Sequence, residues 1–297
     1  MVGMPLPEGL THRPLTVDDA PAVFELWAAT ERRFLGQPLV ERSDVADTLA
    51  VPSVDLDHDS VGVLDGDRLV AWAMFTRGNG LADVGESHAG RGIGTWLVDW
   101  FDRRTGSARV GQEVHVDDAA TETLLAAHGY APSYTSWVLD LAPDVEIPRR
   151  DVPAGFETGA LATGEERAVH EVVESAFAEW GQREPMSYED WDRLVLQADR
   201  FRPERVVVCR RDGEVVGACV VVDAPDACWV WQLAVRAEHR GRGLAQAMMA
   251  RAFTEARGRG KDVGRLATDS RTGALGLYEK LGLQVKHEMR EWVRPGE

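Results

Sequence analysis

A glycine-rich turn in the second half of the chain has the residue types of an anion-binding site. The run Arg240-Gly241-Arg242-Gly243-Leu244-Ala245 follows an apolar, strand-like stretch and opens a helix-like one. Glycines let backbone N–H groups approach a ligand closely, and the first N–H groups of a helix lack internal acceptors and carry partial positive charge. The turn therefore predicts a phosphate site, although a tight strand-to-helix connection without a ligand is an alternative explanation at this point.

Local cations would have to offset the charge of the whole chain, which sums to −16. The turn and its flank supply Arg236, Arg240 and Arg242, with His239 as a fourth candidate. The Gly-Lys-Ser/Thr of a Walker loop and the Gly-x-Gly-x-x-Gly of a Rossmann fingerprint are both missing from the turn, so neither of those nucleotide folds is predicted.

The turn belongs to a pattern that occurs twice in the chain. The run His88-Ala89-Gly90-Arg91-Gly92-Ile93-Gly94 returns as His239-Arg240-Gly241-Arg242-Gly243-Leu244-Ala245. Two further matched pairs, one on each side of the turn, keep the same order, which predicts duplicated domains. Because three prolines interrupt residues 142–153, we expect a first domain at 1–150 and a second at 151–297.

The elements around the turn predict an α/β fold in each domain, with a mixed central sheet flanked by helices. In the second domain we expect strands at 206–210, 215–222, 227–235, 265–268 and 284–293. Helices are expected there at 161–180, 190–198, 244–257 and 274–281. The first domain shows the same order, with expected helices at 19–31 and 94–104 and expected strands at 60–64 and 69–75.

The composition of the chain disfavours several classes of protein. Of its 297 residues 44% are hydrophobic and 28% are charged, which suffices for a core in each domain. No stretch approaches the roughly 20 uncharged residues of a membrane span, and the acidic balance disfavours binding to nucleic-acid phosphates. Apolar stretches hold the three cysteines without metal-ligand spacing, which predicts reduced thiols, a cytoplasmic protein and no metal; they are Cys209, Cys219 and Cys228.

The turn and one later motif resemble the GNAT superfamily of acyl-CoA-dependent N-acyltransferases. Residues 240–245 match the family's pyrophosphate motif, Gln/Arg-x-x-Gly-x-Gly/Ala. The run Leu277-Tyr278-Glu279-Lys280-Leu281-Gly282-Leu283 is similar to the family's later signature, a tyrosine in a helix that ends at a glycine. The resemblance covers residues 151–297 and, in reduced form, 1–150, and the tandem arrangement is similar to that of the mycothiol synthases.

The resemblance implies an acetyl-CoA-dependent N-acetyltransferase, in which a primary amine of a small molecule attacks the acetyl carbonyl directly. The backbone of Leu233-Ala234-Val235 would bind the pantetheine arm, and the N–H groups of residues 240–245 would bind the pyrophosphate. Tyr278 would protonate the leaving thiolate, and the N–H group of Val235 would stabilise the oxyanion. Ser270 stands where the family often has an asparagine and would contact coenzyme A. Either Asp269 or Ser270 is expected to cap the helix that follows.

The sequence does not fix the general base. Gln232 stands where some family members have a glutamate, and an amide cannot accept a proton usefully. We take Glu184 as the candidate base, although a solvated surface charge is its simpler explanation. The other candidate carboxylates of the same region are Glu179, Glu189 and Asp190. Two histidines, His170 and His239, and deprotonation through ordered water are open alternatives.

Large aromatic side chains accompany these carboxylates. Trp180 and Trp191 flank the loop 180–185, where the family's acceptor site usually lies. Most such side chains belong to a core, but one of the two is expected to wall the acceptor pocket.

The first domain departs from the family at three points. Ala89 replaces the expected Gln or Arg, Leu125 replaces the expected tyrosine, and the strand before the turn is shorter. We therefore expect this domain to be structural or regulatory and not catalytic.

Two other functions stay open on the sequence alone. One is a mycothiol synthase, which would acetylate the cysteine amine of a cysteinyl glucosaminyl-inositol. The other is a non-catalytic acyl-CoA-binding sensor. The sequence predicts neither the acceptor, the acyl-chain preference nor the oligomeric state.

Overall fold

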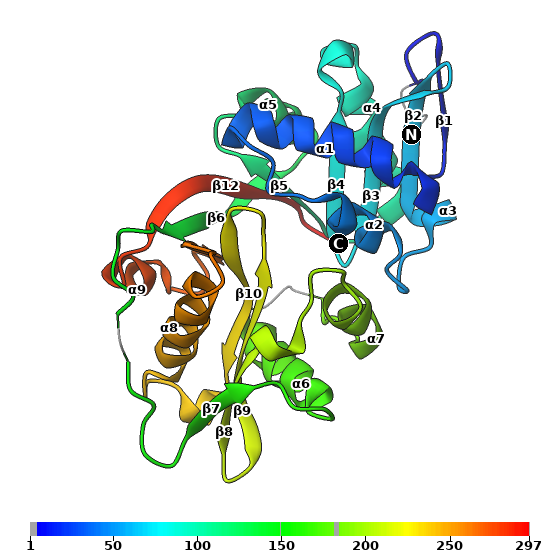
Figure 1. Ribbon diagram of the computed structural model, residues 1–297. Coiled ribbons are helices and arrows are strands. Elements are labelled where there is room, and N and C mark those ends of the chain that lie inside the picture. Colours follow the sequence, from blue (N-terminus) through cyan, green and yellow to red (C-terminus); the bar gives the residue numbers. More distant parts are fainter. Residues whose placement is uncertain (1–4, 149, 181–183, 297) are drawn as a thin grey trace. The chain divides into compact units, whose positions relative to one another are not determined.

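The computed structural model describes residues 5–148, 150–180 and 184–296, and the chain divides into two compact units (Figure 1). The first unit consists of residues 1–135 together with 289–297, and the second of residues 136–288. Residues 136–150, which the sequence assigned to the first domain, thus lie in the second unit. The last residues of the chain lie in the first.

The first unit is a mixed sheet flanked by helices. Its sheet runs in the order β1-β2-β3-β4-β5 and then residues 289–294 of the last strand; only the β4–β5 pair is parallel. The strands are β1 (Leu10–Arg13), β2 (Ser60–Asp65), β3 (Arg68–Thr76), β4 (Asn79–Val84) and β5 (Val110–His115). The helices are α1 (Ala20–Leu35), α2 (Arg42–Leu49), α3 (Leu56–Asp59), α4 (Ile93–Thr105) and α5 (Ala119–Ala127).

The second unit repeats this architecture. Its sheet order is β6-β11-β10-β9-β8-β7, again with one parallel pair, β10–β11. The strands of this sheet are β6 (Ala131–Leu141), β7 (Glu157–Ala160), β8 (Val207–Arg211), β9 (Glu214–Asp223), β10 (Ala227–Val235) and β11 (Val263–Asp269). The last strand, β12 (Gln284–Arg294), begins in this unit and continues into the first. The helices are α6 (Glu166–Phe177), α7 (Tyr188–Trp191), α8 (Leu244–Arg257) and α9 (Leu275–Lys280). The predicted mixed sheet with flanking helices is thereby confirmed.

The final strand of each half completes the sheet of the other unit. Residues 136–141 of β6, which follows the last helix of the first half, pair antiparallel with β11. Residues 289–294 of β12, which follows the last helix of the second half, pair antiparallel with β5. Because the two strands are exchanged, no single point in the sequence separates the units.

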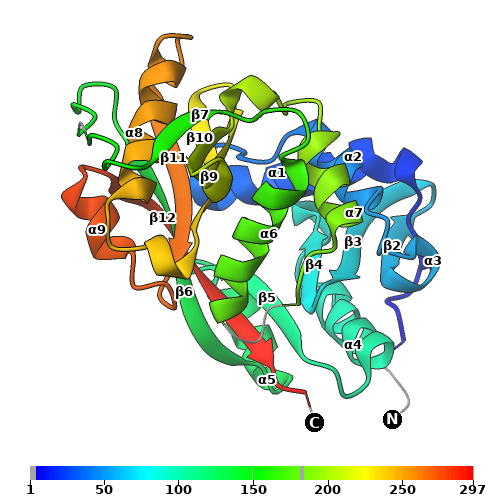
Figure 2. The same cartoon turned by 90° about the horizontal axis from the view of Figure 1, so that it is seen from below.

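Helices cover both faces of the second unit's sheet, with α6 on one face and α8 on the other (Figure 2). Alternate residues of β9 serve the two layers, as strand geometry requires. Cys219 and Val221 pack beneath α8, whereas Ala218 and Val220 pack against α6.

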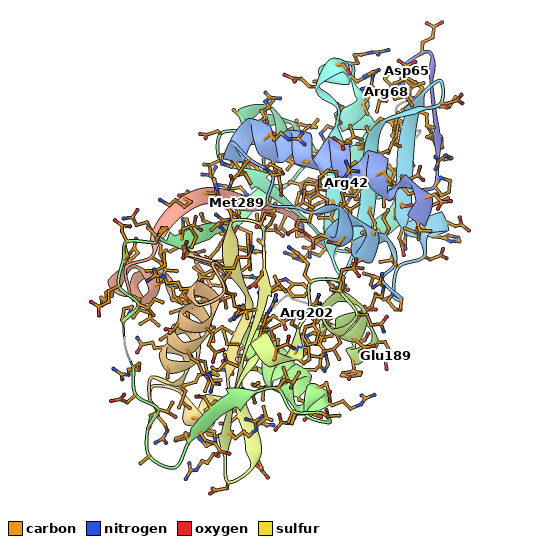
Figure 3. The ribbon with its side chains drawn as sticks, viewed as in Figure 1. Arg42, Asp65, Arg68, Glu189, Arg202 and Met289 are labelled. Atoms are coloured by element: carbon orange, nitrogen blue, oxygen red, sulfur yellow. The ribbon has the colours of Figure 1, made fainter. Side chains whose placement is uncertain are left out.

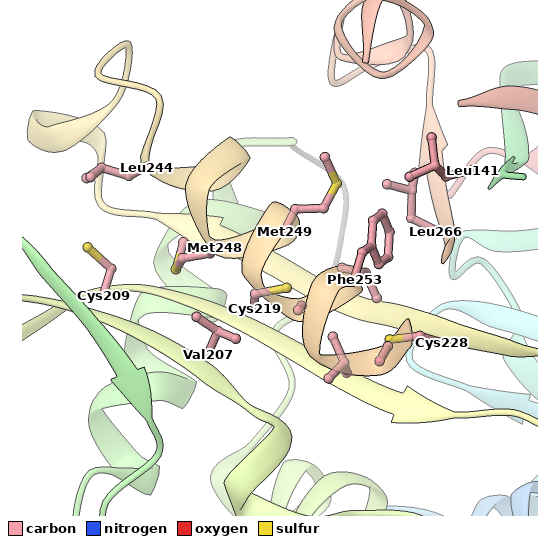
Figure 4. Packing of buried hydrophobic residues seen from close by; sticks show 14 of the residues in the cluster. Leu141, Val207, Cys209, Cys219, Cys228, Leu244, Met248, Met249, Phe253 and Leu266 are labelled. Carbon is pink, nitrogen blue, oxygen red and sulfur yellow. The ribbon is translucent and has the colours of Figure 1, made fainter. Parts of the chain in front are cut away.

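The three cysteines belong to the layer beneath α8, together with Met248 and Phe253 (Figure 4). All three are buried free thiols, as the sequence predicted. Burial raises the pKa of Cys209 to about 11 and that of Cys228 to about 12, and it also raises the pKa of Cys219. These thiols therefore stay protonated near neutral pH and pack as small apolar groups.

No helix in the described part of the chain is long and apolar enough to cross a membrane.

Candidate functional site

The two strands that frame the site separate halfway along their length. β10 pairs with β9 from Cys228 to Val235, but with β11 only from Ala227 to Val230. The register with β9 shifts between Val230 and Gln232, which makes Trp231 the extra residue of a β-bulge. The edge of β10 that faces β11 is therefore not used by that strand beyond Val230. An extended ligand could pair with this edge as an added strand would.

The glycine-rich turn lies at the end of β10 and opens α8 as predicted. Gly241 and Gly243 have φ values of +72° and +83°, a conformation that favours glycine. Gly243 is the N-cap of α8 and has no side chain with which to cap it, and the first turn of the helix has no acidic residue. The N–H groups of this first turn thus need an acceptor from outside the helix, which suits an anion.

Two of the turn's arginines are engaged in bonds within the protein. Arg240 donates from Nε to the carbonyl oxygen of Val235 at 2.9 Å, and from Nη1 and Nη2 to Glu179 at 2.5 and 3.0 Å. Arg236 donates from Nε to the carbonyl oxygen of Val215 at 3.0 Å. Arg242 is exposed. Hydrogen bonds to the strands and to Glu179 thus occupy Arg240 and Arg236, two of the side chains predicted to face a phosphate.

A cation that the sequence reasoning missed lies directly over the turn. A Cβ atom added to Gly243 would meet the guanidinium of Arg150, with Nη2 at 2.7 Å and Cζ at 2.9 Å. Arg150 lies in the proline-rich segment 142–153, 93 positions before Gly243 in the sequence. No local sequence pattern could therefore have predicted that the two residues lie close together.

Tyr278 lies on α9 and packs against the apolar layer beneath α8, as do Leu233 and Ala245. Cys219, a member of the same layer, pairs across the sheet with Leu233 of β10. The tyrosine is thus close to the part of β10 predicted to bind pantetheine. Burial, and secondarily Cys219, raises the pKa of Tyr278 to about 12, so its hydroxyl keeps its proton near neutral pH.

Gln232 has a structural partner. Its Oε1 accepts a hydrogen bond of 2.9 Å from Nε1 of Trp191, and both side chains are buried. Trp191 is only 1% exposed and belongs to the layer beneath α6, so of the two tryptophans it is the core residue. Trp180 instead is half-buried, and its ring stacks on Phe177 with centroids 4.3 Å apart.

The candidate bases lie in different environments. Glu179 is paired with Arg240, and this hydrogen bond lowers its pKa. Asp190 is buried, whereas Glu184 and Glu189 are exposed, the latter on α7 (Figure 3). Residues 181–183 of the predicted acceptor loop lie outside the described residues. No single carboxylate is distinguished as the base by these positions.

The histidines considered as bases have packing roles. His170 donates from Nε2 to the carbonyl oxygen of Met186 at 2.9 Å and lies against the rings of Tyr188 and Trp191. His239 contacts Phe156 edge-on at 5.5 Å between centroids. Among the described residues its buried Nδ1 atom has no hydrogen-bond partner.

The segment after β11 differs from expectation. Asp269 accepts hydrogen bonds from Arg271, through N, Nε and Nη2, instead of capping α9. The N-cap of α9 is Ala274, whose N–H donates to Thr272 Oγ1. Ser270 is exposed beside this ion pair.

The first unit keeps the turn but not the rest of the site. Its α4 also begins at a left-handed glycine, Gly92, with no side-chain cap. However, β4 has six residues where β10 has nine, and β4 pairs with β5 only at Asn79 and Gly111. Leu125, at the position that corresponds to Tyr278, is buried and has no proton to donate.

In the described part of the chain, the side chains that could coordinate a metal ion do not form a cluster. Across residues 5–148, 150–180 and 184–296, no three of the His, Cys, Asp and Glu side chains form such a group.

Comparison with known proteins places the turn and Tyr278 within one family match. Residues 167–283 match the Acetyltransferase (GNAT) family. A curated relative, the mycothiol acetyltransferase of Thermobispora bispora, is 28% identical over 230 residues, which are 73% of this chain and 77% of the relative.

Solved structures match the whole chain. A GCN5-related N-acetyltransferase from Sphaerobacter thermophilus has a TM-score of 0.77 and 28% identity, and the match covers 99% of this chain and 98% of that one. A tandem GNAT protein from the clavulanic acid biosynthesis pathway has a TM-score of 0.70 and 17% identity, covering 96% and 98% of the two chains. At 17% identity, the similarity to this second structure shows a shared fold only.

Proposed function

We propose that the second unit transfers the acetyl group of acetyl-CoA to a primary amine of a small molecule, because residues 167–283 match the GNAT acetyltransferase family and the chain has a tandem GNAT fold. The proposal rests on one observation: three features of an acetyl-CoA site occur together in the second unit. They are the separated strands β10 and β11, the uncapped glycine turn before α8, and Tyr278 on α9.

Binding would use mainly backbone groups. The pantetheine arm would pair with Leu233-Ala234-Val235 on the edge of β10 that β11 does not use. The pyrophosphate would accept hydrogen bonds from the N–H groups of residues 240–245, where the start of α8 adds partial positive charge. Ser270, exposed after β11, is proposed to contact the cofactor from the other side.

The reaction would proceed by direct attack. The amine nitrogen forms a bond to the acetyl carbon, the carbon–sulfur bond breaks, and coenzyme A leaves as a thiolate. The N–H group of Val235 would stabilise the negative charge on the carbonyl oxygen in the transition state. Tyr278 would then give its proton to the sulfur, because its raised pKa keeps the hydroxyl protonated over the working range.

Before it can attack, the amine must lose a proton. We propose Glu184 as the base because it belongs to the predicted acceptor loop 180–185, is exposed, and forms no ion pair with an arginine among the described residues, in contrast to Glu179. Transfer through ordered water is the competing route, and the two routes predict different responses to substitution of Glu184.

The first unit is proposed to be structural or regulatory. Its short β4 gives a pantetheine arm little backbone to pair with, and Leu125 offers no proton to a thiolate. Calorimetry should therefore find one acetyl-CoA site per chain, and two equivalent sites would overturn this assignment.

A second candidate acceptor is the cysteine amine of a cysteinyl glucosaminyl-inositol. The relative from Thermobispora bispora, a mycothiol acetyltransferase, favours it, since the match extends over 73% of this chain. A cationic acceptor such as a polyamine or an aminoglycoside is favoured instead by the net charge of −16.

The test is the release of coenzyme A, followed with a thiol reagent, from acetyl-CoA and each of these three acceptors. We expect turnover with at least one amine and its loss in the Tyr278→Phe variant. Tight binding of acetyl-CoA without release on any acceptor would indicate a non-catalytic acyl-CoA sensor and overturn the proposal.

A further inference from the structure

The linker, residues 142–148 and 150–156, runs along α8 from its end to its beginning. Near the end of the helix, Arg257 donates from Nη2 to the carbonyl oxygens of Ala142 and Val145 at 2.9 and 2.8 Å. Farther along, Ile147 and Pro148 line a shallow apolar hollow together with Met249 and Ala250 of α8. Figure 1 shows this segment passing beside α8 before β7 begins.

At the start of α8, the linker places the positively charged side chain of Arg150. The guanidinium of Arg150 lies against the Cα side of Gly243, where any larger residue would collide with it. Gly243 is the N-cap of α8, so the guanidinium lies beside the N–H groups that have no acceptor within the helix. The positively charged guanidinium and the positive end of the helix dipole therefore lie next to each other and repel. An anion bound between them would stabilise this arrangement.

The other cations of the turn are less suited to this task. Arg240 is bonded to Glu179 and to the backbone of Val235, and Arg236 is bonded to the backbone of Val215. Arg150 is exposed. Its planar guanidinium can donate two parallel hydrogen bonds to a phosphate.

We propose that Arg150 is a phosphate-binding residue of the acetyl-CoA site, supplied by the linker and not by the GNAT motif itself. This inference rests on the proposed function, because it takes acetyl-CoA as the ligand of the turn. The phosphate bound is either the pyrophosphate or the 3′-phosphate of the coenzyme, which have the same chemistry toward a guanidinium.

The first unit offers an internal comparison. Its lead segment Pro7-Glu8-Gly9-Leu10 matches Pro153-Ala154-Gly155-Phe156, and each forms a turn closed by a backbone hydrogen bond, of 3.2 and 3.1 Å respectively. By this match Arg150 corresponds to Met4, which carries no charge and lies outside the described residues. Within the described part of the chain, the atom nearest to a Cβ built on Gly92, the counterpart of Gly243, is Cγ of Pro7 at 3.9 Å. Among the described residues, a guanidinium thus lies over the turn glycine of the second unit and not over that of the first, which agrees with the assignment of acetyl-CoA to the second unit.

The experiment compares three acetyl donors in the Arg150→Gln variant of the full chain. With acetyl-CoA we expect KM to rise about tenfold with kcat nearly unchanged, since a charge-assisted phosphate contact is lost. With S-acetylpantetheine, which has no phosphate, KM should not change. Acetyl-dephospho-CoA lacks the 3′-phosphate and distinguishes the two phosphates. If Arg150→Gln raises its KM as much as that of acetyl-CoA, Arg150 binds the pyrophosphate. If the variant leaves its KM unchanged, Arg150 binds the 3′-phosphate. Arg150→Lys should recover part of the affinity.

Arg68→Gln is the matched control, because it removes one positive charge from an exposed strand end in the first unit (Figure 3). It should leave all three donors unaffected. An unchanged KM for acetyl-CoA in Arg150→Gln overturns the inference, as does an equal rise with S-acetylpantetheine, which would show a structural role. Calorimetry measures the affinity of the same variants for acetyl-CoA and so tests the role of Arg150 in binding independently of turnover. A failure of the proposed acetyl transfer is therefore distinguishable from a failure of this inference.

Discussion

Glu179, which follows α6, accepts two hydrogen bonds from Arg240, which precedes α8, at 2.5 and 3.0 Å. The same guanidinium holds the carbonyl oxygen of Val235 at the end of β10. One side chain thus joins the segment before the predicted acceptor loop to the strand end and the turn that would bind acetyl-CoA. The pair couples the two halves of the proposed site.

Breaking this pair should affect the acceptor more than the donor. We expect Glu179→Gln and Arg240→Gln each to raise the acceptor KM about fivefold, because the segment after α6 loses its attachment. The double variant should be no worse than either single one, since both remove the same contact. Steady-state kinetics on the four proteins measures this, and fully additive effects would contradict the coupling.

Tyr278→Phe should lower kcat about 100-fold and leave the KM for acetyl-CoA nearly unchanged, because only the proton donor is removed. Since the pKa of Tyr278 is raised to about 12, the wild-type kcat should show no loss from tyrosine ionisation below about pH 10. Tyr188→Phe, on α7, is the matched control and should keep full activity. An unchanged kcat in Tyr278→Phe would remove the tyrosine from the mechanism.

Strong local signals were sufficient for the elements that frame the site. The bounds of β10 and α8 agree with prediction, because an apolar run ends at a glycine turn and an amphipathic stretch follows it. The region around α7 agreed less well. A helix expected at 190–198 is instead α7, capped by Ser187, followed by a π-helical stretch at Asp192–Leu196. Acidic and aromatic residues there serve caps and the core, which obscures the helical period.

Partners that are distant in the sequence could not be predicted. An alternating strand such as β12 shows which of its faces is buried but does not identify the strand it pairs with, so the exchange of β6 and β12 left no local signal. The same holds for Arg150, because only the path of the linker along α8 brings it to Gly243. The hydrogen bond between Trp191 and Gln232 likewise depends on packing of the layer beneath α6.

That hydrogen bond should be measurable as stability. We expect Trp191→Phe to lower the free energy of unfolding by about 1–3 kcal/mol, because the amide of Gln232 stays buried without its donor. Replacing both residues, Trp191→Phe with Gln232→Leu, should cost less than the sum of the single changes. Denaturant titrations of the three variants give the coupling, and an exact sum would show that the bond contributes nothing.

Glu184→Gln tests the proposed base. If Glu184 accepts the proton of the amine, kcat should fall at least about tenfold and the acidic limb of its pH profile should disappear. Glu189→Gln, which changes another exposed carboxylate, on α7, is the control and should change neither. A Glu184→Gln profile identical to the wild type would favour deprotonation through water.

The stability of the first unit should depend on pH through Asp83 of β4. Burial raises the pKa of this carboxyl to about 7, although Thr30 and Trp72 donate hydrogen bonds that act in the opposite direction, and the nearby charge of Glu31 adds to the rise. The folded unit therefore binds a proton more tightly than the unfolded chain, in which an aspartate has a pKa of about 3.9. The contribution is present in full below about pH 4 and is lost as the pH rises to about 7.

We accordingly expect the free energy of unfolding to fall by on the order of 2–4 kcal/mol between pH 4 and pH 8 through this one group. Asp83→Asn cannot ionise but keeps an oxygen that can accept from Trp72, so it should flatten the pH dependence and be more stable than the wild type at pH 8. Asp67→Asn, in the exposed turn between β2 and β3, should retain the wild-type dependence. Chemical denaturation of the three proteins at four pH values tests this, and a parallel curve for Asp83→Asn would mean that the carboxyl is ionised in the folded state.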